Sequence, residues 1–472
     1  MDSKFALQAA RVACALALAA TGCGDDDAVR PSDAGRDTGV TTDGGGTDTD
    51  SGGPDSGGGG CVAGTCPPVA DLTRDVTDTS LMLDLTTHAG TAVLTVAGSA
   101  TSSGATFEVG DLAISSVKLG ETELMYTTTD GKLDIGVPAG SEPVALTIAY
   151  TFMDHPDFDG WMPAAGVSFL WPYFCGNLFP CHSNPADGST FTMNVTGAPE
   201  GTVLVYPMTI ATQAPTYMPA VAAGRYTYLM LGRTTAGTEV GVYYLEGGET
   251  DAMAGAGNLD GYFDFYERTY GAYPFGDRVA SVSAAWAPDG DYGGMEHHPF
   301  WHVHTNSMAR AEVHAHEAAH GWFGDGIRIA CWEDFVLSEG LATYMAARSI
   351  EAADGAPAGA AIWASYQSEL DDILAGGGDT IALPDSTCNE IDIYTHPIWS
   401  GVPYMKGAFF MRAVEMAVGR TELDAALRHF YEMKVGQAAH MQDLLETIQT
   451  DTGFDPTDLA NAWLRSMGAP GA

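Results

Sequence analysis

The hydrophobic pattern of this 472-residue chain changes once, near residue 250. Before that point, short segments rich in β-branched and aromatic residues alternate apolar and polar positions, as residues 91–98, 144–152, 189–197, 225–232 and 239–247 do. A period of two is typical of strands with one buried face. Beyond residue 251, alanine-rich segments with helical periodicity follow, and the clearest are residues 308–323, 337–353, 407–419 and 439–453. The pattern predicts a multidomain α+β fold, in which an antiparallel β-sandwich-like domain (residues 67–248) precedes a mainly helical domain (residues 249–472).

The N-terminal segment has a different composition from the rest of the chain. Lys4 and Arg11 precede an apolar run over residues 12–20, which is too short to cross a bilayer and is typical of an export signal. The run leads into LAATGC, which resembles the bacterial lipobox, in which the cysteine is acylated. This pattern predicts a signal peptide over residues 1–22 and a lipidated Cys23. An ordinary cleaved signal with an incidental cysteine is the alternative.

The segment that follows Cys23 is made almost entirely of Gly, Asp, Ser and Thr up to residue 60. Because it cannot bury a core, we expect residues 23–66 to act as a disordered tether. The formal charge of −41 argues against nucleic acid or an anionic membrane surface as a partner. We therefore expect a protein of the bacterial cell envelope, held at the outer membrane or cell surface through its N-terminal lipid alone, or else secreted.

Six cysteines remain when Cys14 in the signal and Cys23 are set aside. An even number in an exported protein favours disulfide bonds. Proximity in the sequence suggests Cys61–Cys66 and Cys175–Cys181, which leaves Cys331–Cys388, although the sequence does not prove this connectivity. Zinc binding by these cysteines is less favoured, because the chain contains no CxxC pair.

The segment HAHEAAHGWFGD, residues 314–325, carries the candidate chemistry. His316 and His320 stand four residues apart, which places both imidazoles on one face of a helix, where they can bind one metal ion. Glu317 lies beside the first of them and is placed to take a proton from a metal-bound water. His314 lies about 200° around the helix from His316. We therefore assign His314 no role in metal binding.

A tetrahedral catalytic zinc site needs a third protein ligand, with water in the fourth position. Glu333 and Glu339 both follow the histidines, and the spacing favours Glu339, because eighteen residues separate it from His320. The alternative for Glu339 is a structural glutamate at a helix start, near a Ser338 cap. Asp325, Glu333 and Asp334 are candidates to orient a ligating histidine, and the sequence does not choose among them.

HExxH followed after eighteen residues by Glu and Gly is the signature of the gluzincins. The longer stretch HEAAHGWFGD…CWEDFVLSEGLATY resembles the aminopeptidase N family of zinc metallopeptidases. Further segments resemble the same family in the same order, namely LFPCHSNPADGSTFTMNVTG (178–197), GGMEH (293–297), VPYMKGAFF (402–410) and AWLRSMGAP near the C-terminus. The resemblance runs from about residue 70 to the end and implies that residues 249–472 form a thermolysin-like catalytic domain.

The resemblance also implies the roles of individual residues. One zinc ion would be held by His316, His320 and Glu339, with Glu317 as the general base. Tyr404 matches the tyrosine that stabilises the oxyanion. The GxMEN motif of the family, which binds the substrate, is matched by Gly293, Gly294, Met295 and Glu296. Glu296 then holds the free α-amine of a peptide or protein substrate, and the implied activity is that of an aminopeptidase.

The chain departs from the family pattern in three places. His297 replaces the usual asparagine, and Phe169 or a neighbour stands where relatives carry an amine-binding glutamine. The C-terminal helical domain of larger relatives has no counterpart, so we expect a more open cleft. These differences leave open an endopeptidase or another zinc hydrolase on the same scaffold, or a catalytically inactive surface-binding lipoprotein. The four nearby histidines are expected at solvent-facing or rim positions and not in a second metal site; they are His297, His298, His302 and His304.

Overall fold

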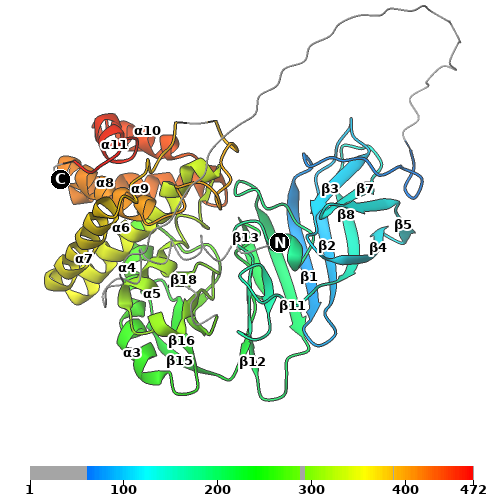
Figure 1. The fold of residues 1–472 in the computed structure, drawn as a ribbon, viewed down its shortest axis with the longest axis horizontal. Coiled ribbons are helices and arrows are strands. Elements are labelled where there is room, and N and C mark those ends of the chain that lie inside the picture. Colours follow the sequence, from blue (N-terminus) through cyan, green and yellow to red (C-terminus); the bar gives the residue numbers. More distant parts are fainter. Residues whose placement is uncertain (1–60, 287–292, 386, 471–472) are drawn as a thin grey trace, which may run out of the picture.

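The computed structural model describes residues 61–286, 293–385 and 387–470. The predicted signal peptide, the lipidated cysteine and most of the tether lie outside the described residues. Within these described ranges, none of the helices has the length and apolar character needed to cross a membrane. Figure 1 shows two bodies side by side, one built of strands and the other mainly of helices.

The N-terminal body is built around a seven-stranded sheet. Its order is β13 (Thr209–Ala214), β11 (Ser189–Thr196), β1 (Val76–Asp84), β2 (Ala89–Val96), β8 (Val144–Thr151), β4 (Ala113–Leu119) and β5 (Thr122–Glu123). Neighbouring strands are antiparallel from β1 to β5, whereas β1 and β11 run parallel. The predicted strands at 91–98, 144–152 and 189–197 are therefore confirmed as β2, β8 and β11.

A three-stranded sheet packs its buried residues into the same core. It consists of β3 (Gly104–Glu108), β7 (Lys132–Gly136) and β6 (Tyr126–Thr129). Phe107 and Ile135 of this sheet, each at most 1% exposed, join Leu94 and Ile148 of the larger sheet in one hydrophobic core. Alternating burial along these strands explains why a period of two predicted the β-rich domain.

Two further sheets connect the β-rich body to the helices. One is the four-stranded sheet of β12 (Val203–Val205), β14 (Ala222–Gly224), β10 (Val167–Phe169) and β9 (Gly160–Met162). The other is the five-stranded sheet of β15 (Tyr226–Arg233), β16 (Glu239–Leu245), β17 (Arg278–Ala284), β19 (His302–His304) and β18 (Gly294–Met295). Because β16 pairs in parallel with β17, the predicted domain boundary at 248/249 falls inside this sheet.

The helical body surrounds α6 (Phe335–Asp354), in which every residue from 335 to 350 is buried. The other helices are α3 (Glu249–Ala256), α4 (Leu259–Tyr270), α5 (Ala311–Ala319), α7 (Ala356–Ala375), α8 (Val402–Val418), α9 (Arg420–Lys434), α10 (Met441–Thr452) and α11 (Thr457–Trp463). Short elements complete the chain, namely η1 (Cys175–Asn177), η2 (Thr305–Ser307), η3 (Trp332–Asp334), β20 (Arg328–Ile329) and β21 (Ala438–Ala439). The helices predicted in the four alanine-rich segments are confirmed as α5, α6, α8 and α10.

A pair of glycines allows α6 and α8 to lie in close contact. A Cβ atom added to Gly340 would lie 2.7 Å from the Cα atom of Gly407, and one added to Gly407 would lie 2.5 Å from the Cα atom of Gly340. Real carbon atoms pack at about 3.5–4.0 Å, so a side chain at either position would force the helices apart. This contact fixes the distance between the two helices that carry Glu339 and Tyr404.

All three expected disulfide bonds are present. Cys61 is joined to Cys66, Cys175 to Cys181, and Cys331 to Cys388. The first two close short loops, while the third joins residues 57 positions apart in the sequence. It connects the chain just before α6 to the segment that leads into α8.

Candidate active site

Three side chains from α5 and α6 bring their donor atoms together. His316 lies in the last turn of α5, and His320 caps that helix with helical backbone angles, so the predicted common face is retained. His316 Nε2 lies 3.1 Å from His320 Nε2, and both approach Glu339 Oε2, at 3.1 and 3.5 Å respectively. Ligands of a tetrahedral zinc bound at 2.0–2.1 Å are about 3.3 Å apart. The three side chains therefore fit a zinc ion without rearrangement.

The charges around these donors also fit a cation. Burial acts to raise the pKa of Glu339, but the imidazoles of His320 and His316 outweigh it and hold that pKa at about 2. Burial acts to lower the pKa of His320, but Glu339, Glu296 and Glu317 together raise it to about 10. Three carboxyl groups thus surround two imidazoles, and this donor set carries an excess of negative charge once a divalent cation displaces its protons.

The second ring nitrogen of His316 and of His320 contacts groups other than the acidic side chains considered for this role, Asp325, Glu333 and Asp334. His320 Nδ1 lies 3.0 Å from the Phe323 carbonyl oxygen and 3.2 Å from Ser338 Oγ. His316 Nδ1 lies 3.4 Å from Thr343 Oγ1. Ser338 is not a helix cap, because α6 begins at Phe335 and the residue before Glu339 lies inside the helix.

The three acidic candidates have other surroundings. Asp325 is fully buried with neither carboxylate oxygen hydrogen-bonded among the described residues. Glu333 accepts backbone N–H groups of residues 389–391, and Asp334 binds His440 and the backbone N–H of Met441. Orienting a ligating histidine through any of these carboxylates was therefore the wrong expectation. A carbonyl and hydroxyl groups lie closer to the imidazoles.

Glu317 lies against a backbone that only glycine can provide. A Cβ atom on Gly294 would lie 2.3 Å from Glu317 Oε1, so the absent side chain makes room for the carboxylate. Burial has the largest effect on the pKa of Glu317 and raises it well above its ordinary value. His320 opposes this rise, while Glu296 and Glu339 add to it. Gly293 and Met295 line the same cavity on either side of Gly294.

Glu296 follows directly after β18 and is buried beside the same cavity. Burial raises its pKa to about 7, with Glu339 acting in the same direction and His320 against it. The phenol of Tyr217 lies near this carboxyl group and acts to lower its pKa. Sequence reasoning missed Tyr217, because it lies 79 positions before Glu296 and in no recognisable motif.

Tyr404 comes from the first turn of α8. Its ring stacks on the imidazole of His316, with centroids 5.7 Å apart and an interplanar angle of 22°. It also packs edge-on against Phe335 of α6. The structure therefore places the predicted tyrosine at the wall of the cavity, beside one of the proposed metal ligands.

The neighbouring histidines are interior residues. His297, His298, His302 and His304 are each at most 4% exposed, which corrects the expectation of solvent-facing or rim positions. Pairing of β17, β19 and β18 encloses them, and His297 Nδ1 lies 3.0 Å from His302 Nδ1. His314 is equally buried, with its ring nitrogens 2.8 Å from Ser281 Oγ and 2.9 Å from the Met308 carbonyl oxygen. Both nitrogens of His314 are thus engaged away from the donor cluster.

The donor cluster opens into a cavity of about 230 Å³. Besides the predicted site residues, its wall includes Trp171, Arg310, Glu312, Ile362, Tyr366, Glu369 and Trp399. Phe169 does not line it and packs instead edge-on against His297, whereas its neighbour Trp171 does reach the cavity. These wall residues come from four separate parts of the chain, and no local spacing signals their meeting.

Comparison with known proteins identifies relatives of this chain. Residues 262–463 match the Peptidase family M1 domain. The chain is 26% identical over 270 residues to aminopeptidase M1-B of Oryza sativa subsp. japonica, covering 54% of this chain and 30% of that protein. Aminopeptidase M1-C of the same plant is 23% identical over 433 residues, covering 83% of this chain and 48% of that protein. The chain thus spans half or less of the length of these relatives.

Solved structures share the fold. The M1 zinc metallopeptidase from Deinococcus radiodurans aligns with a TM-score of 0.70 at 20% identity, covering 84% of this chain and 94% of that one. Native yeast LTA4 hydrolase aligns with a TM-score of 0.70 at 19% identity, covering 87% and 72%. Both matches include the β-rich body as well as the helical one. Residues 262–463 are therefore a peptidase family M1 domain, and the ligand cluster and the fold of the described residues agree with this match.

Proposed function

We propose that this protein is an aminopeptidase that uses one zinc ion to hydrolyse N-terminal peptide bonds. The observation that carries the proposal is the triangle of donor atoms from His316, His320 and Glu339, with Glu317 and Glu296 facing the same cavity. When bound, zinc would polarise the scissile carbonyl and make water more acidic. The rest of the chemistry falls to side chains of this chain.

Glu317 has the position and environment of a general base. Its carboxylate lies at the cavity wall against Gly294, and burial makes it a stronger base than an exposed glutamate. It would take a proton from the attacking water and pass it to the departing amine. Tyr404, held by its stacking on His316, would donate a hydrogen bond to the oxyanion.

Glu296 supplies the preference for a free N-terminus. A buried carboxylate with a single hydroxyl group nearby retains acceptor capacity for an ammonium group. Binding an α-amine here would align the N-terminal residue with its peptide bond near Glu317. The aromatic side chains of Trp171 and Trp399 would then lie at the wall of the same cavity.

The decisive experiment compares aminoacyl substrates with free and N-acetylated amines, with and without a chelator, for wild type and Glu317→Gln. We expect the chelator, acetylation and the substitution each to abolish turnover, while Glu317→Gln retains about one zinc per chain. Glu432→Gln, at an exposed ion pair with Arg428, serves as the control and should behave as wild type. Turnover that survives Glu317→Gln would contradict the mechanism, and hydrolysis of acetylated substrates would indicate an endopeptidase.

We also propose that the protein works at the bacterial envelope, held by a lipid on Cys23. Support comes from the sequence, in which an apolar run ends in LAATGC and a tether follows. Metabolic labelling with a palmitate analogue tests this, since Cys23→Ser should lose the label and be released from the membrane fraction. Equal labelling of both proteins would refute the anchor and leave the enzymatic proposal untouched.

A further inference from the structure

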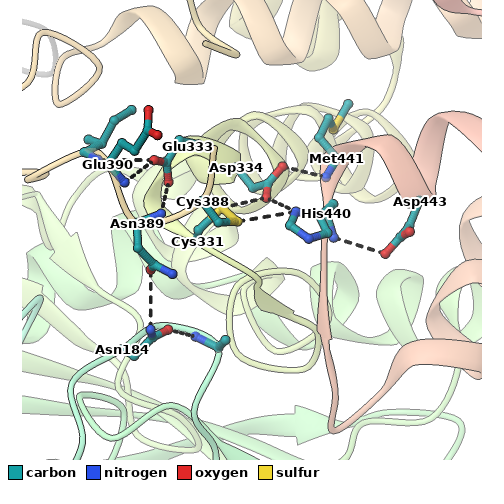
Figure 2. The surroundings of a disulfide bond; sticks show 12 residues. Asn184, Cys331, Glu333, Asp334, Cys388, Asn389, Glu390, His440, Met441 and Asp443 are labelled. Atoms are coloured by element: carbon teal, nitrogen blue, oxygen red, sulfur yellow. Dashed lines mark hydrogen bonds and ion pairs between the residues drawn. A yellow bond between two sulfur atoms is a disulfide. The ribbon is translucent and has the colours of Figure 1, made fainter. Parts of the chain in front are cut away.

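A segment next to the cavity is fastened to the helix that carries Glu339. Residues 388–399, called here the strap, run from the Cys331–Cys388 disulfide bond to Trp399, shortly before α8. Figure 2 shows the fastened end of the strap. Cys331 and Glu333 lie immediately before α6, so the fastening acts on the start of the helix that provides the third proposed zinc ligand.

Glu333 reinforces the disulfide bond by binding the strap backbone. Its Oε1 accepts the N–H groups of Glu390 and Ile391 at 2.9 and 3.2 Å, and its Oε2 accepts that of Asn389 at 3.2 Å. The carboxylate is only 3% exposed. Three consecutive amides on one buried carboxylate form charge-assisted bonds, which are stronger than neutral ones.

The strap is also held from the β-rich body. The backbone N–H of Ile393 donates to Tyr173 Oη at 3.2 Å, and Tyr394 Oη donates to the Trp171 carbonyl oxygen at 3.3 Å. At the disulfide end, Asn184 Nδ2 donates to Asn389 Oδ1 at 3.4 Å. The strap therefore bridges the two bodies of the protein along one side of the cavity.

The far end of the strap provides part of the cavity wall. The rings of Trp399 and Trp171 lie 5.5 Å apart and both line the cavity. Tyr394 packs edge-on against Trp399 at 4.8 Å, so the strap's own aromatic residue supports the wall. An aromatic wall of this kind interacts best with a bulky apolar side chain.

We propose that Glu333 and the Cys331–Cys388 bond are positioning elements that hold the strap as the wall for an apolar side chain of the substrate. This inference rests on the proposed peptidase function. Because the wall contacts a side chain and not the reacting bond, loosening it weakens binding of substrate and transition state alike. KM then rises while kcat stays nearly constant.

The first test is Glu333→Gln, with Asp334→Asn as the matched control. Both substitutions turn a buried carboxylate into an amide at adjacent positions, but the hydrogen bonds of Asp334 to His440 and Met441 go to the start of α10, and Asp334 touches the fastening only at Cys331 Sγ, at 3.4 Å. In Glu333→Gln, an NH₂ group replaces one of the two oxygens that accept backbone N–H groups of the strap, and an NH₂ group cannot accept these hydrogen bonds. For aminoacyl substrates of phenylalanine we expect KM to rise about fivefold or more, with kcat within about twofold of wild type. Alanine substrates should be affected less, and Asp334→Asn should match wild type.

The second test removes the disulfide bond in the double variant Cys331→Ser/Cys388→Ser. Its control is Cys61→Ser/Cys66→Ser, because that bond lies at the start of the β-rich body. We expect the same rise in KM in Cys331→Ser/Cys388→Ser but not in Cys61→Ser/Cys66→Ser, with zinc content unchanged. This pair also keeps the proposal testable if Glu333→Gln fails to fold.

Three outcomes would overturn the proposal. They are an unchanged KM in folded variants of both kinds, a loss confined to kcat, and an equal rise of KM for alanine and phenylalanine substrates. A wild-type protein without zinc-dependent turnover would refute the proposed function itself, which is a different result from an active enzyme with an inert strap.

Discussion

The glycine pair between α6 and α8 offers a direct test of how the fold positions the active site. In Gly340→Ala, the new methyl group would lie 2.7 Å from the Cα atom of Gly407, 3.0 Å from Val336 Cγ2 and 3.2 Å from the Pro403 carbonyl oxygen. Ordinary carbon contacts begin near 3.5 Å, so the two helices must separate by roughly 1 Å. Glu339 precedes the glycine on one helix, and Tyr404 follows Pro403 on the other.

A displacement of that size has a large kinetic effect and a smaller effect on stability. Moving catalytic groups by about 1 Å can cost on the order of 100-fold in rate. Overpacking a core costs about 1–3 kcal/mol, and part of this is offset because alanine favours a helix over glycine by about 1 kcal/mol. We expect kcat/KM to fall by about 30- to 100-fold, while the free energy of unfolding falls by no more than about 2 kcal/mol.

The assay is steady-state kinetics on a free aminoacyl substrate, with zinc content and thermal unfolding measured on the same preparation. Gly261→Ala in α4 is the control, because its Cβ would meet only Ala353 Cβ, at 3.3 Å. That variant should keep wild-type kinetics. If Gly340→Ala kept kcat/KM within about twofold of wild type, the close contact between the helices would not be what positions Glu339 against Tyr404.

Three further predictions address single side chains. Tyr404→Phe should lower kcat by about 10²- to 10³-fold with little change in KM or zinc content, since the ring stacked on His316 remains; steady-state kinetics and metal analysis check this. Glu296→Gln should remove most of the preference for free over N-acetylated substrates, measured as the ratio of their kcat/KM values. Burial raises the pKa of Glu369 to about 8, so its ionisation destabilises the fold as pH rises from about 4.5 through 8. Glu369→Gln should therefore match wild type in thermal unfolding at pH 4 and exceed it at pH 9, by at most about 5 kcal/mol; equal unfolding at both values would show that Glu369 ionises without penalty.

The proposed zinc site was predictable because its geometry is local. His316 and His320 share a helix face through a four-residue spacing, and α5 keeps that face through its last turn. Glu339 lies on a second helix, α6, so local geometry could not predict it. Its eighteen-residue interval from His320 matches the family pattern, and this match predicted it. The strands and helices were likewise predictable from periodicity, since each buries one side against a neighbouring layer.

The surroundings of the site depend on contacts that no local pattern contains. His302 and its neighbours were expected at solvent-facing or rim positions because no spacing supported a metal cage, yet β17 and β18 pair on either side of β19 and these histidines are buried. Tyr217 meets Glu296, and Trp171 meets Trp399, only after the β-rich body docks on the helices. The predicted domain boundary at 248/249 also lies inside a sheet, because β16 before it pairs with β17 after it, and no local pattern contains this pairing.

The two competing carboxylates show where sequence reasoning reaches its limit. Glu333 and Glu339 lie six positions apart, and either had the chemistry to ligate a metal. Glu333 precedes α6 in a short η3 turn, where it meets the amides of residues 389–391, while Glu339 lies in the second turn and faces α5. The spacing favoured Glu339, and the structure places Glu339 and not Glu333 beside the two histidines, but the spacing assigned no function to Glu333. That function depends on a segment more than fifty residues away and on a disulfide bond whose pairing the sequence only suggested. Glu333, rejected as a ligand, is therefore the residue of this site to test for holding the substrate-binding wall in place.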